Sequence, residues 1–411
     1  MKKTPLLLLI FVLALGFSGC QIDMHEFTEV TTYAGTPGVR SSTPPADGLN
    51  GNVITNGAGA VSFSRPEGMA IHGDWLYIGD GGTNRRVRRI RISGVGPVAN
   101  QIGNVQTLIT SLGDIRGIVV DSNGDVIFTD HHAHQVKKYF APDFTSSEYY
   151  GQDLHGTGGG FADGPANAAM FRYPTGVTVD SDGHIYVADT HNFRIRKIDY
   201  VTKVVSTLAG SGENDYIDGK GTAAAFKEVI GLVMDKNGDL ITADSWNQTL
   251  RYIDLEGNTG TYVSFFGDSW GFVDGTAGTA RGGRPQHLHY HAASGIIYFT
   301  DNENAAVRAV TPGYYIYTPN EDELTTRPYP TRKYPDTRIE TRQELMGRFV
   351  YTLAGYRGFS RRANNFPGHG YRDGSNTEAR FNTPRGMAVA PNGDIYVADM
   401  DNYVIRRIVK K

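Results

Sequence analysis

A cluster of histidines has the residue types and the spacing that could bind a metal ion. His131, His132 and His134 lie within the short segment 130–134, and His191 occupies the matching position one repeat later. Imidazole suits zinc, copper or nickel, and three such ligands with one open position make a catalytic site. The competing interpretation is a set of solvated turn histidines, in which case no cofactor is needed. The sequence therefore leaves one divalent-metal hypothesis, at His131, His132 and His134.

Aromatic residues in turns provide a second kind of chemistry. Trp246 and Trp270 lie in two turn or loop segments of neighbouring repeats, and Tyr371 lies in a long loop further along the chain. Flat apolar rings beside a few placed polar groups suit the faces of sugars. The alternative is that these rings plug a channel or hold long loops in place.

Repeated Asp and Asn residues resemble a ring of catalytic carboxylates. The pairs are Asp189/Asn192, Asp244/Asn247, Asp301/Asn304 and Asp399/Asn402. Side chains of Asp and Asn bond nearby backbone N–H groups and stabilise turns. Because a catalytic site does not need so many copies, we interpret these pairs as turn scaffolding. The Asp-Gly pairs that begin at 163, 218, 274 and 373 receive the same interpretation.

Basic residues recur at one place in most repeats, as in the segment Arg194-Ile195-Arg196-Lys197. They alternate with apolar residues, which predicts partly solvated strands rather than a nucleic-acid-binding face. A formal net charge of −3 also gives no general attraction to nucleic acid.

The elements that must position these residues are visible in the segment 174–210. Four short runs of alternating polarity, separated by Gly, Asp and Asn turns, predict a four-stranded antiparallel meander. The second strand of this unit and its turn recur with an Asp at positions 80, 130, 189, 244, 301 and 399. We interpret these as six repeats, the fifth carrying an insertion at about 312–347. Repeats of this length and composition predict a β-propeller.

The two ends of the chain predict how the ring closes. The fourth strand of a repeat ends in words such as Val-Val-Ser-Thr-Leu-Ala-Gly at Gly210, and Glu-Val-Thr-Thr-Tyr-Ala-Gly ends at Gly35. The last repeat has no fourth strand of its own. Pairing Glu29–Ala34 with Val404–Val409 would complete it and leave no open edge. The predicted fold is therefore an all-β, six-bladed β-propeller closed by an N-terminal strand, with residues 20–411 forming one domain.

The sequence pattern of the repeats resembles that of the NHL-repeat family. Segments 171–176 and 381–386 follow the pattern Phe-x-x-Pro-x-Gly, which precedes a strand and an Ile-Tyr-Val-Ala-Asp turn. The resemblance implies the propeller fold and allows both binding platforms and enzymes. Propellers of the peptidyl-hydroxyglycine lyase type bind zinc through histidines of several blades. The corresponding starts of the first strands here are Glu67, Arg116, Thr175, Ile230, Gln286 and Arg385, so that zinc site is not expected.

In such a fold, the turns between second and third strands and the loops that enter each first strand share one face. This face surrounds the mouth of the central channel. Candidate ligand-binding residues are those expected at the mouth: Trp246, Trp270, His191, Arg116, Arg385 and Glu67.

The first residues predict a targeting segment. Lys2 and Lys3 precede the apolar run 6–15, which is too short to span a bilayer, and Cys20 follows small residues. This resembles a bacterial lipobox and predicts a signal peptide at 1–19 with lipidation at Cys20. The whole pattern resembles NHL-repeat lipoproteins of Bacteroidetes, which implies the outer membrane, with its periplasmic side or the cell surface left open.

These observations predict a binding or scaffold protein for a glycan, or for an envelope protein partner in a nutrient-uptake complex. The alternative is a lyase or glycoside hydrolase that acts at the channel mouth through Glu67, Arg116, Arg385 and the histidines. Contact with the membrane would be through the lipid anchor alone, and no nucleic-acid partner is expected.

Overall fold

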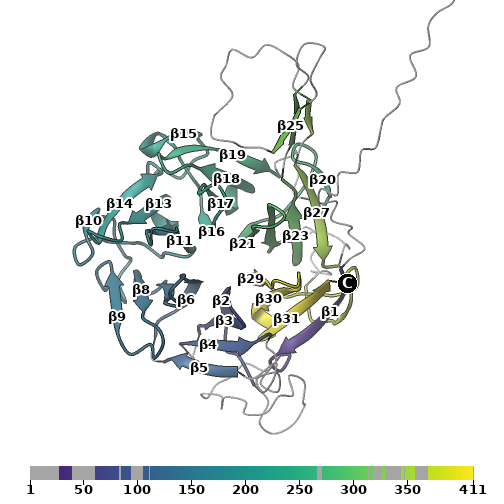
Figure 1. Cartoon of the computed structure of the whole chain (residues 1–411), viewed down its shortest axis with the longest axis horizontal. Helices are drawn as coiled ribbons and strands as arrows, with labels where there is room; N and C mark the ends of the chain where they lie inside the picture. Colours follow the sequence, from purple (N-terminus) through teal and green to yellow (C-terminus); the bar gives the residue numbers. More distant parts are fainter. Residues whose placement is uncertain are drawn as a thin grey trace, which may run out of the picture.

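The computed structural model is a ring of six β-sheets, or blades, around a central channel (Figure 1). It describes residues 27–38, 61–82, 85–93, 105–110, 112–265, 271–312, 314–317, 325–328, 344–346, 348–356 and 369–410. The predicted all-β, six-bladed propeller is confirmed. Among the described residues, no helix is long and apolar enough to cross a membrane.

In the first three blades, the four main strands follow one another along the chain from the innermost strand to the outer side of the ring. Blade 1 consists of β2 (Pro66–His72), β3 (Trp75–Asp80), β4 (Arg86–Arg91) and β5 (Val105–Ile109). Blade 2 consists of β6 (Ile115–Val120), β7 (Val126–Asp130), β8 (Gln135–Tyr139) and β9 (Ser147–Tyr150). Blade 3 consists of β11 (Val177–Val179), β12 (Ile185–Asp189), β13 (Arg194–Ile198), β14 (Val204–Ala209) and the outer β10 (Gly164–Pro165).

Like blade 3, blades 4 to 6 each carry a fifth, two-residue outer strand. Blade 4 contains β16 (Val229–Met234), β17 (Leu240–Asp244), β18 (Thr249–Ile253), β19 (Asn258–Ser264) and β15 (Gly219–Lys220). Blade 5 contains β21 (Pro285–His291), β22 (Ile296–Asp301), β23 (Ala306–Val310), β27 (Phe349–Ala354) and β20 (Gly275–Thr276). Blade 6 contains β29 (Pro384–Val389), β30 (Ile395–Asp399), β31 (Val404–Lys410), β1 (Phe27–Ala34) and β28 (Gly374–Ser375).

A separate three-stranded sheet lies in the chain between β23 and β27. Its strands are β24 (Tyr314–Tyr317), β25 (Thr325–Pro328) and β26 (Glu344–Met346), in the order β25-β24-β26. Because β23 pairs directly with β27, this sheet is inserted between the third and fourth strands of blade 5.

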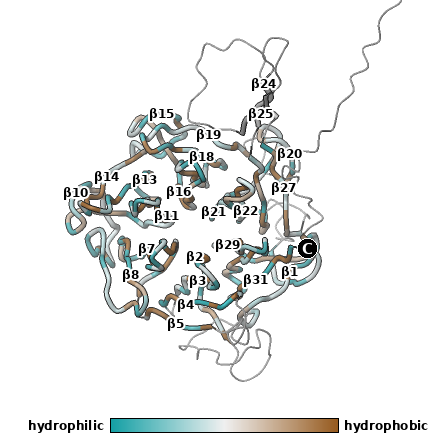
Figure 2. Tube along the Cα trace, viewed as in Figure 1, coloured by the Kyte–Doolittle hydropathy of each residue, from teal (hydrophilic) through white to brown (hydrophobic). Residues whose placement is uncertain are grey.

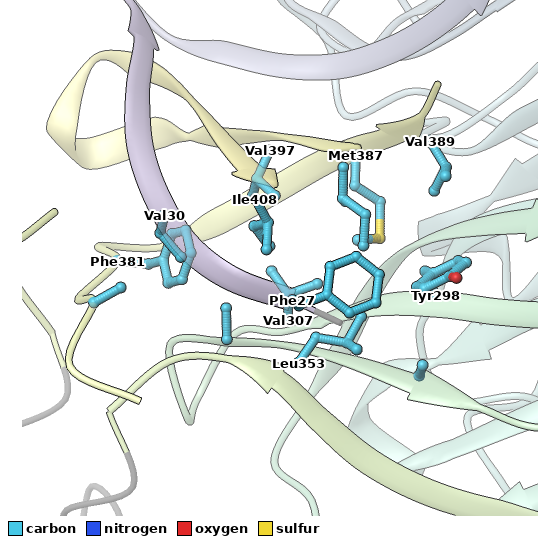
Figure 3. Packing of buried hydrophobic residues seen from close by; sticks show 14 of the residues in the cluster. Phe27, Val30, Tyr298, Val307, Leu353, Phe381, Met387, Val389, Val397 and Ile408 are labelled. Carbon is cyan, nitrogen blue, oxygen red and sulfur yellow. The ribbon is translucent and has the colours of Figure 1, made fainter. Parts of the chain in front are cut away.

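Ring closure pairs the two segments that the sequence predicts. Strand β1 pairs antiparallel with β31, with Glu29 opposite Val409; a register shift between Thr32 and Ala34 then sets Ala34 opposite Ile405 rather than Val404. Phe27 and Val30 are buried between blades 5 and 6, where they join Tyr298, Leu353 and Met387 in one apolar cluster (Figure 3). The N-terminal strand therefore joins the first and last parts of the chain through both backbone pairing and core packing.

The core consists of layers between blades rather than one central mass. Six apolar clusters among the described residues each join two neighbouring blades. Figure 2 accordingly shows apolar and polar stretches interspersed around the whole ring. Both faces of each sheet are thus covered, which is why the second strands of blades 2 to 6, such as Ile185–Asp189, are buried at every residue.

Buried arginines stabilise the loops that enter five of the six blades. Arg196 on β13 donates from Nη1 to Asp189 Oδ2 (2.7 Å) and from Nη2 to Asp163 Oδ1 (2.5 Å). Its guanidinium carbon lies 4.9 Å from the ring centroid of Phe161 and 5.1 Å from that of Phe171. Equivalent fully buried arginines with paired carboxylates occur in four other blades: Arg88, Arg251, Arg308 and Arg406.

This arrangement corrects one sequence expectation and confirms another. The alternating basic residues are not all on a partly solvated face, because the arginine of each of these five blades is 0% exposed. The repeated Asp and Asn residues are turn scaffolding, as predicted. Asp189 Oδ1 accepts from the backbone N–H of Arg172, and its Oδ2 accepts from Asn192 Nδ2.

Candidate functional site

In five blades, the innermost strand has a register shift near its start. Several of the candidate residues lie at these shifts. In blade 1, Pro66 pairs with Asp80 but Met69 pairs with Ile78, so the residues between them, Glu67 and Gly68, form a bulge. The same shift occurs at the corresponding places in blades 2, 4, 5 and 6. Bulges redirect side chains and are frequent beside functional sites. All of these bulges lie at the strand end that faces the turns between second and third strands.

Glu67 is the centre of an ion-pair network at the channel mouth. Its side chain is 1% exposed, and Oε1 accepts from Arg116 Nη1 at 2.9 Å. Arg116 Nη2 also lies 2.9 Å from Asp114 Oδ2. Burial opposes ionisation of Asp114, but the Arg116 and Arg65 guanidinium groups outweigh it and lower the pKa of this carboxyl. Two of the predicted residues, Glu67 and Arg116, are therefore in direct contact.

Arg385 continues the network toward blades 5 and 4. Its Nη1 donates to Gln286 Oε1, and its Nε lies 3.9 Å from Glu67 Oε1. Gln286 Nε2 in turn donates to Ser245 Oγ at 3.0 Å, beside Trp246. A connected set of polar side chains thus runs from blade 1 to blade 4 along the mouth.

Trp246 provides an exposed ring at one end of this set. It lies in the 3₁₀ turn Ser245–Asn247, between β17 and β18, and is 46% exposed. The Arg284 guanidinium carbon lies 3.9 Å from the indole centroid, and Arg284 Nη2 also pairs with Glu228 Oε2. A cation stacked on the ring restricts its orientation and leaves an amphipathic surface. Trp246 therefore presents an exposed ring in the turn between the second and third strands of blade 4.

A second group of rings surrounds Tyr173, between blades 2 and 3. Its ring centroid lies 4.4 Å from that of His134 and 4.7 Å from that of His191. His131 and His132 lie slightly farther away, at 4.9 and 6.3 Å. His191 is exposed in the turn Thr190–Asn192, so the predicted residue lies on the mouth face, beside a tyrosine that sequence reasoning did not select.

The histidines of this group are directed toward different partners. The backbone N–H of Tyr173 donates to His134 Nδ1 at 2.9 Å, whereas His131 Nδ1 lies 3.2 Å from Pro174 O. His132 Nδ1 lies 3.6 Å from Asp114 Oδ2. Across the ranges that the structure describes, no three His, Cys, Asp or Glu side chains are grouped to hold a metal ion. The predicted site at His131, His132 and His134 is therefore not assembled, because each ring already has another neighbour.

Residues of the innermost strands line a small cavity of the channel, which we call the throat. At the position that follows Glu67 in blade 1, and at its equivalent in the other repeats, five blades have glycine and blade 5 has His287; the glycines are Gly68, Gly117, Gly176, Gly231 and Gly386. These glycines permit close contact between blades. A Cβ on Gly117 would lie 2.2 Å from Thr175 O, and one on Gly386 would lie 1.8 Å from Glu67 O. The break in this ring of glycines is visible in the sequence only after the starts of the innermost strands have been aligned.

His287 gives the fold a predictable sensitivity to acid. Burial, together with the positive charges of Arg385 and Arg116, lowers the pKa of His287 to about 3. The unfolded chain therefore binds more protons than the folded one between about pH 6.5 and pH 3, and folding stability falls as the pH drops through this window. We expect His287→Gln to lose less thermal stability than the wild type between pH 7 and about pH 4.5. An equal loss in both proteins, measured by circular dichroism, would contradict this assignment.

Two predicted residues, and residues 357–368 of the long loop that precedes Tyr371, cannot be compared with the structure. Trp270 and Cys20 lie outside the described residues.

Tyr371 does not contribute to the mouth. Its hydroxyl bonds Thr32 Oγ1 at 2.7 Å and its ring lies 5.0 Å from the Arg406 guanidinium, so it fixes the N-terminal strand and a loop.

Comparison with known proteins agrees with this architecture. A family model described as "NHL repeat" matches residues 171–198 and 381–405, which lie in blades 3 and 6. The "Protein SUPPRESSOR OF QUENCHING 1, chloroplastic" of Arabidopsis thaliana is 44% identical over 93 residues. This alignment covers 23% of the present chain and 9% of that much longer protein.

Solved structures from Bacteroides share the fold over nearly the whole chain. An auxiliary nutrient binding protein from Bacteroides ovatus has a TM-score of 0.59 and 20% identity, covering 94% of this chain and 77% of that one. An auxiliary nutrient binding protein from Bacteroides thetaiotaomicron has a TM-score of 0.59 and 16% identity, with coverages of 92% and 76%. Identity at this level shows a common fold.

Proposed function

We propose that this NHL-repeat, six-bladed β-propeller is a binding protein whose ligand, a glycan, lies across the channel mouth. The observation that carries the proposal is the exposed Trp246 ring, stacked on Arg284 and connected through Ser245 and Gln286 to Arg385. Sugar-binding sites combine such apolar ring surface with a few fixed polar groups. The Trp246 turn supplies the ring surface, and the Glu67 network supplies the fixed polar groups.

Rigid placement of the polar groups favours binding. Their orientation is fixed by mutual hydrogen bonds before a ligand arrives, so little side-chain freedom is lost on association. The Bacteroides nutrient-binding structures support a binding role for this architecture. A partner protein of an uptake complex is the alternative occupant of the same face.

The competing enzymatic function, a lyase or glycoside hydrolase, receives less support from the contacts of Glu67. Its carboxylate is surrounded by the guanidinium groups of Arg65, Arg116 and Arg385. A general acid has to deliver a proton to the leaving group, and a general base has to reach its substrate. A carboxylate already shared among three cations is better suited to holding those cations in place.

Replacement of Trp246 tests the proposed function. We expect Trp246→Ala to bind an oligosaccharide from a glycan panel about tenfold more weakly than the wild type, or about 1.4 kcal/mol, by isothermal titration calorimetry. Trp75→Ala is the matched control. Trp75 also stacks with an arginine, Arg89 at 4.1 Å, but lies at the start of β3, on the opposite face.

Three outcomes would contradict this function. Equal affinity of wild type and Trp246→Ala would exclude the Trp246 platform, and binding lost only in Trp75→Ala would place the ligand on the other face. New reducing ends or unsaturated products after incubation with the panel would show an enzyme.

We also propose that Cys20 anchors the protein to the bacterial outer membrane. The support is the sequence of the first twenty residues, since two or more acyl chains give stable membrane association. Expressed in a Bacteroides host, the wild type is expected in the membrane fraction and Cys20→Ser in the soluble fraction. Equal membrane association of the two proteins would contradict lipidation at Cys20.

A further inference from the structure

The throat is a small cavity with one ionisable side chain. Its volume is about 40 Å³, and its lining includes Gly68, Gly117, Gly176, Gly231 and His287. The other lining residues are apolar: Met69, Ile118, Val177, Leu232, Leu288 and Met387. His287 is therefore the one lining residue whose side chain can donate or accept a hydrogen bond.

The size of this cavity limits what it can hold. One water molecule needs roughly 10–15 Å³ of such a cavity, so the cavity accommodates about three atoms of that size. A carboxylate group consists of one carbon and two oxygens and fits this space. A whole sugar ring does not, so the ring would have to remain at the mouth above.

The charges at the entrance to the cavity favour an anion. In the ion-pair network around Glu67, three guanidinium groups meet two carboxylates, from Arg65, Arg116, Arg385, Glu67 and Asp114. The positive charges of Arg385 and Arg116 both act on His287. Within this network, the guanidinium groups therefore outnumber the carboxylates by one.

Arg385 is the least neutralised of these cations. Its buried Nε has no hydrogen-bond partner, and the distance of 3.9 Å to Glu67 Oε1 is too long for one. Burial lowers the pKa of the Arg385 guanidinium, and the neighbouring arginines lower it further: Arg116, Arg65 and Arg284. A donor of this kind gains a strong, charge-assisted hydrogen bond when a carboxylate arrives.

We propose that the throat is a subsite for a carboxylate group of the ligand, held by Arg385 at the entrance and by the imidazole N–H of His287 within. This inference rests on the proposed function, because the carboxylate is assigned to a glycan that stacks on Trp246. The ligand class that it specifies is an acidic glycan containing uronic acid residues. The sugar ring would lie at the mouth, with its carboxylate directed into the throat.

The test compares an oligogalacturonate with the same oligosaccharide after its carboxylates have been reduced to alcohols. Binding to the full chain in detergent is measured by calorimetry. We expect the wild type to bind the acidic form at least tenfold more tightly, and Arg385→Gln to lose this preference. Arg91→Gln is the matched control, since Arg91 is paired with Asp74 on the opposite face and should leave the preference intact.

A second variant covers the case in which Arg385→Gln does not fold. His287→Gly gives blade 5 the residue that the other five blades already have, and it removes the imidazole donor without disturbing the Glu67 network. We expect this variant to reduce the preference for the acidic form several-fold. An unchanged preference in both folded variants, or equal affinity of the wild type for both oligosaccharides, would overturn the inference.

Two further arms separate the throat from the glycan-binding function. If the neutral form binds as tightly as the acidic form and Trp246→Ala weakens both, the proposed function stands and the carboxylate subsite is wrong. If free glucuronate raises the melting temperature in an Arg385-dependent manner but no oligosaccharide binds, the subsite stands and the glycan function is wrong. Stabilisation by inorganic sulfate but not by glucuronate would indicate a tetrahedral anion and overturn the carboxylate assignment.

Discussion

A protein that lacks residues 27–35 is expected to lose its cooperative unfolding transition and to aggregate when heated. The deletion removes the strand that pairs with β31 from Phe27–Lys410 to Ala34–Ile405. It also removes apolar side chains from the layers between blades 5 and 6 and between blades 6 and 1. The remaining ring would have an open strand edge, which is a template for association. Circular dichroism melting and light scattering measure both effects.

A point substitution tests the same closure without shortening the chain. Val30 is 0% exposed and faces the blade 5–6 layer, whereas the adjacent Glu29 is exposed. Val30→Asp buries an unpaired carboxylate and is expected to destabilise the fold by about 4 kcal/mol or more. Glu29→Lys, one residue away on the same strand, should change stability by less than about 0.5 kcal/mol. Similar melting temperatures for the two variants would show that this strand does not close the ring.

The second large effect is expected from a buried arginine. Arg196→Met leaves the fully buried Asp189 carboxylate without its cation and frees the loop carboxylate of Asp163. Breaking a buried pair from one side costs about 3–5 kcal/mol. Lys197→Met is the control, since Lys197 is only partly buried on the same strand, and a loss below about 1 kcal/mol is expected. Urea unfolding followed by circular dichroism provides the free energies of unfolding.

A double variant checks that the pairing is the cause. Asp189→Asn combined with Arg196→Met removes both charges, so it should be less destabilised than the sum of the single variants by about 0.5–3 kcal/mol. Strict additivity would show that Arg196 acts through its packing between Phe161 and Phe171 rather than through its charge.

The fold could be predicted in detail because its local signals agree with each other. Alternating runs between Asp and Asn turns fix the strand boundaries, so the second strands end at the repeated aspartates, as at Asp189 and Asp399. The register of closure around Val30 could be predicted because a one-residue shift would turn Val30 from the core toward solvent. Both features depend on neighbours along one strand, which sequence patterns record directly.

The buried arginines could not be assigned from alternation alone. A period of two shows which residues share a face, but it does not show whether another blade covers that face. Arg196 follows Asp189 by seven residues, and the same interval separates Asp244 from Arg251. This interval was the available signal. It indicates a contact because position 196 lies opposite Val187, two residues before the carboxylate.

The sequence was sufficient to predict where the candidate site lies, but not which of its side chains contact one another. Strand order places Glu67, Arg116 and Arg385 at one mouth of the channel, although they come from three blades. Their ion pairs depend on how long side chains cross the channel, and no local pattern encodes that. Likewise, the histidine-rich turn could indicate a metal site, whereas the contacts of His131 and His134 depend on Pro174 and Tyr173 in the next blade.

Hydrogen–deuterium exchange of the full chain, with and without a saturating oligosaccharide, tests the central claim that the ligand lies at this mouth. We predict slower exchange in segments 245–247, 284–287 and 384–387, which contain the Trp246 turn and two inner-strand starts. The turns of the opposite face, at 73–74 and 121–125, should exchange at the same rate in both samples. Protection of those turns, with none at the mouth, would contradict the account.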